Sequence, residues 1–225
     1  MTERESVMER AEKAILFDLD GTLINSAPGI EDAYAFTLRS FNLPIPDDIH
    51  SMIGPSIYEI LKDRFDISGS KLDKAVHLFR DRYAATGLLN YTKYDGIDEA
   101  LRFLQRDGYG LHIATSKLDS MARSIIEHAK WDSLFLSING ADRSGLRYRK
   151  RDIIRFAIDN FLPRTPIAAM VGDTVADIEG GKDAGLSTIG VAWGYGNVCD
   201  LQNAGATLIA ASPGDLIERL ESLQK

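Results

Sequence analysis

The sequence contains few of the residues on which several classes of protein depend. Of its 225 residues only one, Cys199, is a cysteine, and its four histidines (His50, His77, His112 and His128) are scattered. An intrachain disulfide is therefore excluded, and no set of Cys and His residues has the spacing of zinc ligands. A single cysteine fits a reducing compartment, so we expect the protein to be cytoplasmic.

Long apolar runs and an excess of positive charge are also missing. No run approaches the roughly 20 apolar residues that span a bilayer, and residues 1–13 lack the apolar segment of a secretory signal. The 33 acidic residues outnumber the 26 basic ones and give a net charge of -7, which provides no positive field for nucleic acid. We expect a small-molecule substrate, no membrane or nucleic-acid partner, and a monomer or weak homodimer.

Short apolar runs do occur, and they alternate with segments of helical periodicity. This alternation is typical of a parallel sheet covered by helices. Three runs end in small polar or acidic residues, and two more would extend the sheet; they cover 14–17, 111–114, 167–171, 187–192 and 207–209. Because ligands of such sheets bind beyond the carboxyl ends of the strands, the first three runs predict one shared site.

A long segment with helical pattern and no convincing strand separates the first two runs. Ile30, Tyr34 and Leu38 recur at helical spacing there, and a second apolar stripe runs from Leu72 to Tyr83. A direct crossover between parallel strands needs only about a dozen residues. We therefore predict an α/β fold in which residues 1–24 and 91–225 form a Rossmann-like core, with an α-helical cap inserted at residues 25–90.

Four aspartates follow the apolar runs in two pairs. Asp18 and Asp20 come directly after the first run, and Asp173 and Asp177 follow the third. Paired acids persist at a strand end if they are exposed or if a cation relieves their repulsion, so an exposed turn is the alternative for Asp18 and Asp20 taken alone. Four carboxylates at one sheet edge require a divalent cation, and their oxygen-only ligand set indicates Mg²⁺.

Residues of other types suit a phosphate group. Lys150 offers a point charge, and Thr115 with the backbone of Ser116 offers neutral hydrogen-bond donors. The sequence thus predicts a site for a metal ion and a phosphate at the same edge of the sheet.

In combination these segments resemble the haloacid dehalogenase superfamily, specifically its phosphatases with a small helical cap inserted after the first motif. The segments that carry the resemblance occur in the family's order; they are Asp18–Leu23, Thr115–Lys117, Lys150 and Gly172–Asp177. Similarity to the phosphoglycolate phosphatase-like branch lies in 53–55, 94–97, 185–186 and 190–196. Many relatives have proline after the motif lysine, where this chain has Arg151.

The resemblance implies a role for each site residue. Asp18 would attack phosphorus to form an aspartyl phosphate, and Asp20 would protonate the leaving group and then activate water. Mg²⁺ would be held by Asp18, by the backbone carbonyl of Asp20 and by Asp173, while Asp177 would orient Lys150 or a metal-bound water. The residues that would bind the phosphate are Gly21, Thr22, Thr115, Ser116 and Lys150.

These observations favour a Mg²⁺-dependent phosphatase of a small phosphorylated metabolite. The cap would select the substrate, and the sequence leaves open whether this is phosphoglycolate-like, a sugar phosphate or a nucleoside monophosphate. A phosphomutase that transfers phosphate between sugar hydroxyls is one alternative. A non-catalytic binding protein on the same fold is the other.

Overall fold

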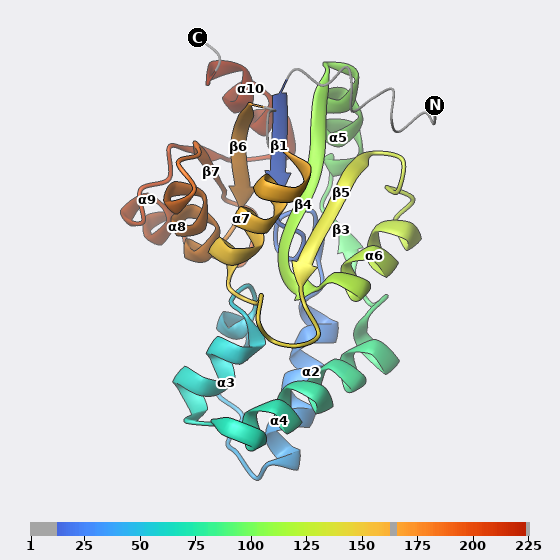
Figure 1. Cartoon of the computed structure of the whole chain (residues 1–225), viewed down its shortest axis with the longest axis vertical. Helices are drawn as coiled ribbons and strands as arrows, with labels where there is room; N and C mark the ends of the chain where they lie inside the picture. The colour runs from blue at the N-terminus through green and yellow to red at the C-terminus, as the bar shows by residue number, and fades with distance from the viewer. Residues whose placement is uncertain (1–12, 163–165, 224–225) are drawn as a thin grey trace.

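The computed structural model describes residues 13–162 and 166–223. The first twelve residues, on which the expectation about a secretory signal largely rests, lie outside the described residues. Figure 1 shows two lobes, an α/β lobe and a smaller helical lobe beyond the arrowheads of the central strands.

A six-stranded sheet forms the centre of the larger lobe. Its strand order is β5-β4-β1-β6-β7-β8, and every neighbouring pair is parallel. These strands are β1 (Lys13–Phe17), β4 (Tyr109–Leu118), β5 (Phe135–Ala141), β6 (Ile167–Gly172), β7 (Thr188–Val191) and β8 (Leu208–Ala210). The helices of this lobe are α5 (Ile97–Arg106), α6 (Asp119–His128), α7 (Lys150–Phe161), α8 (Val175–Asp183), α9 (Val198–Asn203) and α10 (Pro213–Ser222).

Strand β1 shows how the sheet divides the core between its two faces. Ile15 and Phe17 belong to the apolar cluster under α5, α6 and α10, whereas Ala14 and Leu16 belong to the cluster under α7. Alternate residues of a strand point to opposite faces, so a strand covered on both faces is continuously apolar. This fold confirms the predicted α/β class, and all five predicted strand runs form strands of the sheet.

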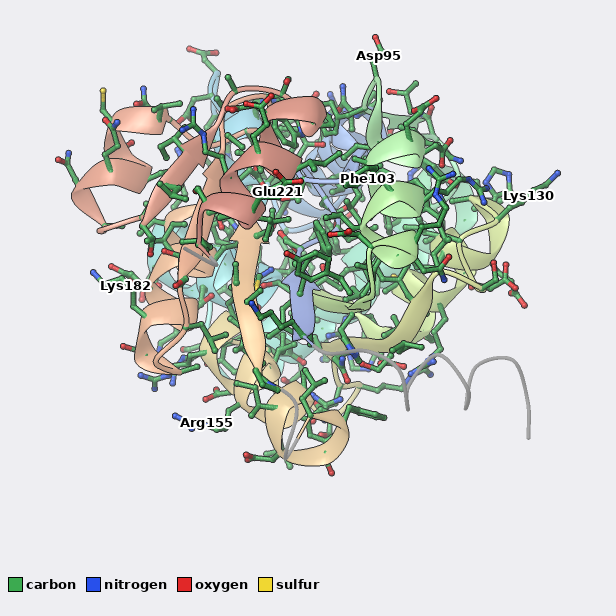
Figure 2. All side chains as sticks on the ribbon, turned by 90° about the horizontal axis from the view of Figure 1, so that it is seen from above. Asp95, Phe103, Lys130, Arg155, Lys182 and Glu221 are labelled. Atoms are coloured by element: carbon green, nitrogen blue, oxygen red, sulfur yellow. The ribbon has the colours of Figure 1, made fainter. Side chains whose placement is uncertain are left out.

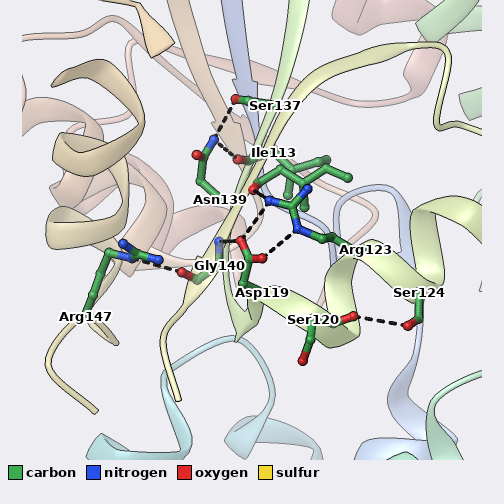
Figure 3. A network of polar contacts seen from close by, with 10 residues as sticks. Ile113, Asp119, Ser120, Arg123, Ser124, Ser137, Asn139, Gly140 and Arg147 are labelled. Carbon is green, nitrogen blue, oxygen red and sulfur yellow. Dashed lines mark hydrogen bonds and ion pairs between the residues drawn. The ribbon is translucent and has the colours of Figure 1, made fainter. Parts of the chain in front are cut away.

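Strand β5 was not predicted, because polar residues interrupt its apolar pattern. Ser137 and Asn139 are both buried in it. The Asn139 amide donates hydrogen bonds to the carbonyl oxygen of Ile113 (2.9 Å) and to the Ser137 hydroxyl (2.8 Å), as Figure 3 shows. Arg123 on α6 donates to the carbonyl oxygen of Ile138 (2.9 Å). Hydrogen bonds within the folded protein thus satisfy these polar groups. In the sequence alone, the same polar residues favour a loop over a strand.

The helical lobe has a core of its own, in which Tyr34, Leu38, Met52, Leu61 and Val76 are buried. Its elements are α2 (Ala27–Ser40), the 3-10 turn η1 (Ile49–Met52), α3 (Ile57–Phe65), α4 (Gly69–Arg82) and the π-helical turn η2 (Tyr83–Gly87). This lobe is the helical insertion expected from the sequence, although the boundaries at residues 25 and 90 stay a prediction.

A short antiparallel ribbon joins the two lobes. It pairs β2 (Ile24–Asn25) with β3 (Thr92–Lys93), where the chain leaves the α/β lobe and returns to it. The expectation that no strand lies between the first two runs was therefore wrong for these few residues. Two residues in each strand are too short for a periodic pattern to be recognised in a sequence.

Charged side chains cover the outside of the molecule. Figure 2 shows Lys130, Arg155 and Lys182 projecting outward from the edge of the α/β lobe, and all three are exposed. Among the described residues, no helix has the length and apolar composition needed to cross a membrane.

His112 in β4 is an exception, because it is a titratable side chain inside the core. It is 2% exposed, and its Nδ1 lies 2.8 Å from the Ser137 hydroxyl. Burial lowers the pKa of His112 from 6.5 to about 4, so the folded protein holds the neutral imidazole at neutral pH.

This depressed pKa predicts a specific acid sensitivity. Below pH 6.5 the unfolded chain takes up a proton at His112 that the folded chain does not, so stability is lost as the pH falls from 6.5 toward 4. Between pH 7.5 and pH 5 we expect wild type to lose about 2 kcal/mol more of its unfolding free energy than His112→Asn does. Urea denaturation of each protein at both pH values measures this, and equal losses in the two proteins would contradict it.

Candidate active site

The loop after β1 places Asp18 and Asp20 at the carboxyl end of the sheet. The Asp18 amide donates to the carbonyl oxygen of Val171 on the neighbouring strand (2.9 Å), which continues the sheet pairing by one residue. Gly21 then turns the chain with φ +81°, and a Cβ at this position would collide with the Asp173 carboxylate. Glycine is therefore required here both for the turn and for the close approach.

The other two aspartates come from the end of β6 and the start of α8. Thr174 is the N-cap of α8, and its backbone N–H and hydroxyl both donate to Asp177 Oδ2, at 3.0 and 2.7 Å. This capping box fixes Asp177 in the first turn of the helix. Asp173 accepts hydrogen bonds from the Thr22 hydroxyl (3.0 Å) and from the backbone N–H of Tyr195 (2.8 Å).

Lys150 joins the two pairs of acids. It is the first residue of α7, is 3% exposed, and its Nζ lies 2.7 Å from Asp18 Oδ1 and 2.8 Å from Asp177 Oδ1. Its basic neighbours Arg149 and Arg151 lie 3.7 Å from Glu59 and Asp152 instead. Burial alone would lower the pKa of Lys150, but Asp177 and Asp18 outweigh burial and raise it.

The remaining predicted residues occupy two different positions. Thr115 and Ser116 lie within β4, which continues to Leu118, and they line the same cavity as Asp18 and Asp20. Thr22 is fully buried and bonded to Asp173, so its hydroxyl supports that carboxylate. The structure thus brings all the predicted residues to one edge of the sheet, with Gly21 and Thr22 behind the acids.

Asp20 is held by a second lysine, to which the sequence analysis gave no role. Lys117 Nζ lies 3.1 Å from Asp20 Oδ2 and donates to the Tyr83 hydroxyl of the helical lobe (2.8 Å). Ser26 donates to the other Asp20 oxygen at 2.5 Å. The pKa of Lys117 is raised because Asp20 and Tyr83 outweigh the effect of burial. Lys117 lies two residues after Thr115, and residues at this spacing point to the same side of a strand. This spacing was the signal by which the sequence could have placed Lys117 in the site.

The loop that follows β7 was also missed as part of the site. Besides its backbone bond to Asp173, Tyr195 accepts a hydrogen bond from the Ser26 backbone N–H on its hydroxyl oxygen (2.8 Å). In the sequence, residues 190–196 contribute only to the resemblance to the phosphoglycolate phosphatase-like branch. Apart from glycines, nothing in this segment signals chemistry.

The acids are crowded and buried, which affects their protonation. Burial raises the pKa of Asp18 to about 7, although Lys150 opposes this, and burial with the nearby Asp177 and Asp18 raises the pKa of Asp173 well above its usual value. Lys117 and Lys150 neutralise two of the four carboxylates. Two negative charges therefore remain to be compensated when all four are ionised.

This arrangement fits a divalent cation. Asp18, Asp173 and Asp177 each offer a carboxylate oxygen, and these atoms lie within 4.8 Å of one another. An oxygen-only set with two uncompensated negative charges suits Mg²⁺, which binds hard oxygen ligands. The Asp20 carboxylate is outside this group and is engaged by Lys117 and Ser26, so Asp20 could contribute only its backbone carbonyl, as the family resemblance implies.

Comparison with known proteins gives consistent matches. The family model described as haloacid dehalogenase-like hydrolase matches residues 15–191. A 5'-nucleotidase of Pseudomonas aeruginosa is 33% identical, and the match covers 92% of this chain and 95% of the nucleotidase. Tyrosine-protein kinase PtkA of Mycobacterium tuberculosis is 32% identical over 96% of this chain and 75% of the kinase. A phosphoglycolate phosphatase of Aquifex aeolicus is 30% identical over 93% of this chain and 97% of that phosphatase.

Solved structures agree with these matches. The crystal structure of a predicted phosphatase from Clostridium acetobutylicum is 31% identical, superposes with a TM-score of 0.88, and covers 94% of this chain and 99% of its own. The family model and the phosphatase relatives confirm the predictions of a phosphoric monoester hydrolase and of similarity to the phosphoglycolate phosphatase-like branch. Together with the aspartates at the carboxyl end of the sheet, they show that the chain belongs to the haloacid dehalogenase-like hydrolases.

Proposed function

We propose that the protein hydrolyses a small phosphomonoester, with the Asp18 carboxylate attacking phosphorus to form an aspartyl phosphate. The observation that carries the proposal is the ion pair of Asp18 with Lys150, at the edge of a cavity lined by residues of both lobes. An ionised carboxylate is the required nucleophile, and the lysine favours that form. The same lysine would then neutralise charge that develops on the phosphate oxygens.

Asp20 is the proposed acid and base. It lines the cavity beside Asp18, and Ser26 and Lys117 hold its carboxylate from two sides. It would donate a proton to the departing alcohol and later accept one from the water that hydrolyses the aspartyl phosphate. Thr115 and Ser116, which line the cavity, would donate hydrogen bonds to the phosphate, whereas Gly21 and Thr22 would act from behind by positioning the acids.

We further propose that Mg²⁺ is the cofactor. Asp18, Asp173 and the backbone carbonyl of Asp20 would hold it, and Asp177 would either join them directly or act through water and through Lys150. When bound, the ion would supply positive charge that brings the phosphate and the Asp18 carboxylate together. The two uncompensated negative charges of the site support this assignment.

Residues 25–90 are proposed to be a cap that covers the phosphate site and selects the substrate. Support comes from the cavity, which is lined by residues of both lobes. The names of the relatives mention nucleotides and phosphoglycolate, and both compounds stay candidates at this point. The cytoplasmic location also stays a prediction, which rests on the single cysteine.

Replacement of the proposed nucleophile gives the most direct test. Asp18→Asn should lower kcat at least a thousandfold, because the amide keeps the shape of the carboxylate but cannot form the aspartyl phosphate. Thermal unfolding should stay cooperative, since Lys150 keeps its partner Asp177. The matched control is Asp159→Asn, on the exposed part of α7, which should retain wild-type kcat. Activity of Asp18→Asn within tenfold of wild type would disprove the assignment.

Metal dependence has a readout that does not involve turnover. Mg²⁺ should raise the melting temperature of the wild-type protein, and it should raise that of Asp173→Asn much less. At a Mg²⁺ concentration one hundred times Kd, binding stabilises the folded state by about 2.7 kcal/mol. EDTA should abolish hydrolysis, and Ca²⁺ should restore it poorly because it takes more ligands at longer distances. Full activity after exhaustive chelation would refute a metal requirement.

Transfer of the phosphate to an acceptor other than water is the second candidate function, and it includes the phosphomutase alternative. The kinase name of one relative favours it. Release of inorganic phosphate in proportion to substrate consumed would support hydrolysis. Phosphate retained on a sugar or peptide product would support transfer. Lack of any turnover across a broad panel of phosphomonoesters with Mg²⁺ would favour the non-catalytic alternative.

A further inference from the structure

The cavity in front of Asp18 and Asp20 has two chemically different sides. The acids, Lys117, Thr115 and Ser116 form its floor on the α/β lobe. The side that faces them is mostly apolar and aromatic, and is formed by residues of the helical lobe that include Ile30, Tyr34, Met52, Ile53 and Phe79. The phosphate would lie on the floor, so the alcohol part of the substrate would contact the apolar side.

Two aromatic rings form the centre of that apolar side. The ring centroids of Tyr34 on α2 and Phe79 on α4 lie 4.6 Å apart, and Tyr83 stacks on Phe79 at 6.2 Å with nearly parallel planes. Phe79 remains partly exposed, whereas Tyr34 is only 2% exposed. Packed aromatic rings of this kind provide a rigid surface against which a flat ring can pack.

The two cations that line the cavity, Lys117 and Arg80, differ in their partners. Lys117 pairs with Asp20 and bonds to Tyr83. Arg80 directs its two terminal nitrogens toward the carbonyl oxygens of Arg143 (3.5 Å) and Asp142 (3.4 Å), and its guanidinium lies over the ring of Tyr58. Among the described residues that line the cavity, Lys117 is thus paired with a carboxylate, whereas Arg80 is held only by neutral backbone carbonyls and an aromatic ring.

The Tyr34 hydroxyl, by contrast, has no partner. It is buried at the cavity, and none of the described residues forms a hydrogen bond with it. Burial raises the pKa of Tyr34, so the group stays a neutral hydroxyl that can donate and accept. Unlike the Tyr109 hydroxyl, the Tyr34 hydroxyl is not fully shielded, so it is accessible beside the cavity and can form a hydrogen bond with a polar atom of the ligand.

We propose that the alcohol part of the substrate is a ring-bearing group that packs on Phe79 and forms a hydrogen bond with the Tyr34 hydroxyl. A nucleoside has both features, whereas a simple benzylic alcohol has only the ring. Glycolate has no ring to pack on Phe79, and its carboxylate would meet the apolar side of the cavity. This inference rests on the proposed function, since it concerns the substrate of the same site.

The first test compares esters of four primary alcohols with Mg²⁺ present. They are a nucleoside 5′-monophosphate, benzyl phosphate, glycerol 3-phosphate and 2-phosphoglycolate. We expect kcat/KM for at least one ring-bearing ester to exceed that for glycerol 3-phosphate and for 2-phosphoglycolate tenfold or more. The better of the two ring-bearing esters identifies the source of the ring as a nucleoside or as a simple aryl alcohol.

The second test assigns the preference to the two aromatic residues. Tyr34→Phe removes only the hydroxyl, so the ratio of kcat/KM for the preferred ring-bearing ester to that for glycerol 3-phosphate should fall about threefold to tenfold. Phe79→Leu should lower the same ratio by about tenfold or more through loss of ring packing. Thermal melts of both variants establish that they are folded.

A matched control is available in Tyr109 at the start of β4. Its hydroxyl is also buried and without a partner, but it does not line the cavity. Tyr109→Phe should therefore leave every kcat/KM unchanged. This control separates a specific effect at Tyr34 from the general effect of removing a buried phenol hydroxyl.

The outcomes that overturn the inference differ from those that overturn the proposed function. Preference for 2-phosphoglycolate, lost selectively in Arg80→Gln, would show that Arg80 receives a carboxylate and would overturn this inference alone. An equal fall for every ester in Tyr34→Phe would overturn it as well. Absence of hydrolysis for all four esters and for a wider panel would overturn the proposed function, and this inference with it.

Discussion

The ion pairs of Lys150 with Asp18 and Asp177 join three elements that are far apart in the sequence. They link the end of β1, the start of α7 and the first turn of α8, all within a nearly dry environment. Buried charges are costly unless they are paired. The position of α7 on the sheet and the capping box of α8 are therefore tied to the same cluster that provides the chemistry. Stability and function depend here on one set of charges.

A second charged pair extends this dependence to the helical lobe. Lys117 contacts Asp20 on one side and the Tyr83 hydroxyl on the other, so the proposed acid and base is connected to a residue of the cap through a single side chain. Any movement that withdraws Tyr83 removes a hydrogen bond from the lysine that neutralises Asp20. The arrangement of the cap and the environment of Asp20 are thus coupled.

The two lobes divide the recognition of a phosphomonoester. Carboxylates, lysines and hydroxyls gather on the α/β side, where a phosphate needs charge and hydrogen bonds, while apolar and aromatic residues of the helical side face them across the cavity. A phosphate group is common to all substrates of such an enzyme, whereas the alcohol differs. Specificity is therefore expected in the lobe that contributes little charge.

The sequence by itself determined the α/β class, the helical insertion, and the convergence of Asp18, Thr115 and Asp173, whereas only the family resemblance pointed to Lys150. Local patterns carry this information, because apolar runs mark parallel strands and the residues after them must meet at one sheet edge. Only the tertiary structure revealed β5, whose buried polar residues are satisfied by distant partners. It alone also decided that Lys117 pairs with Asp20, that Tyr195 supports Asp173, and that the Tyr34 hydroxyl faces a cavity unpartnered, since each depends on contacts between segments remote in the chain.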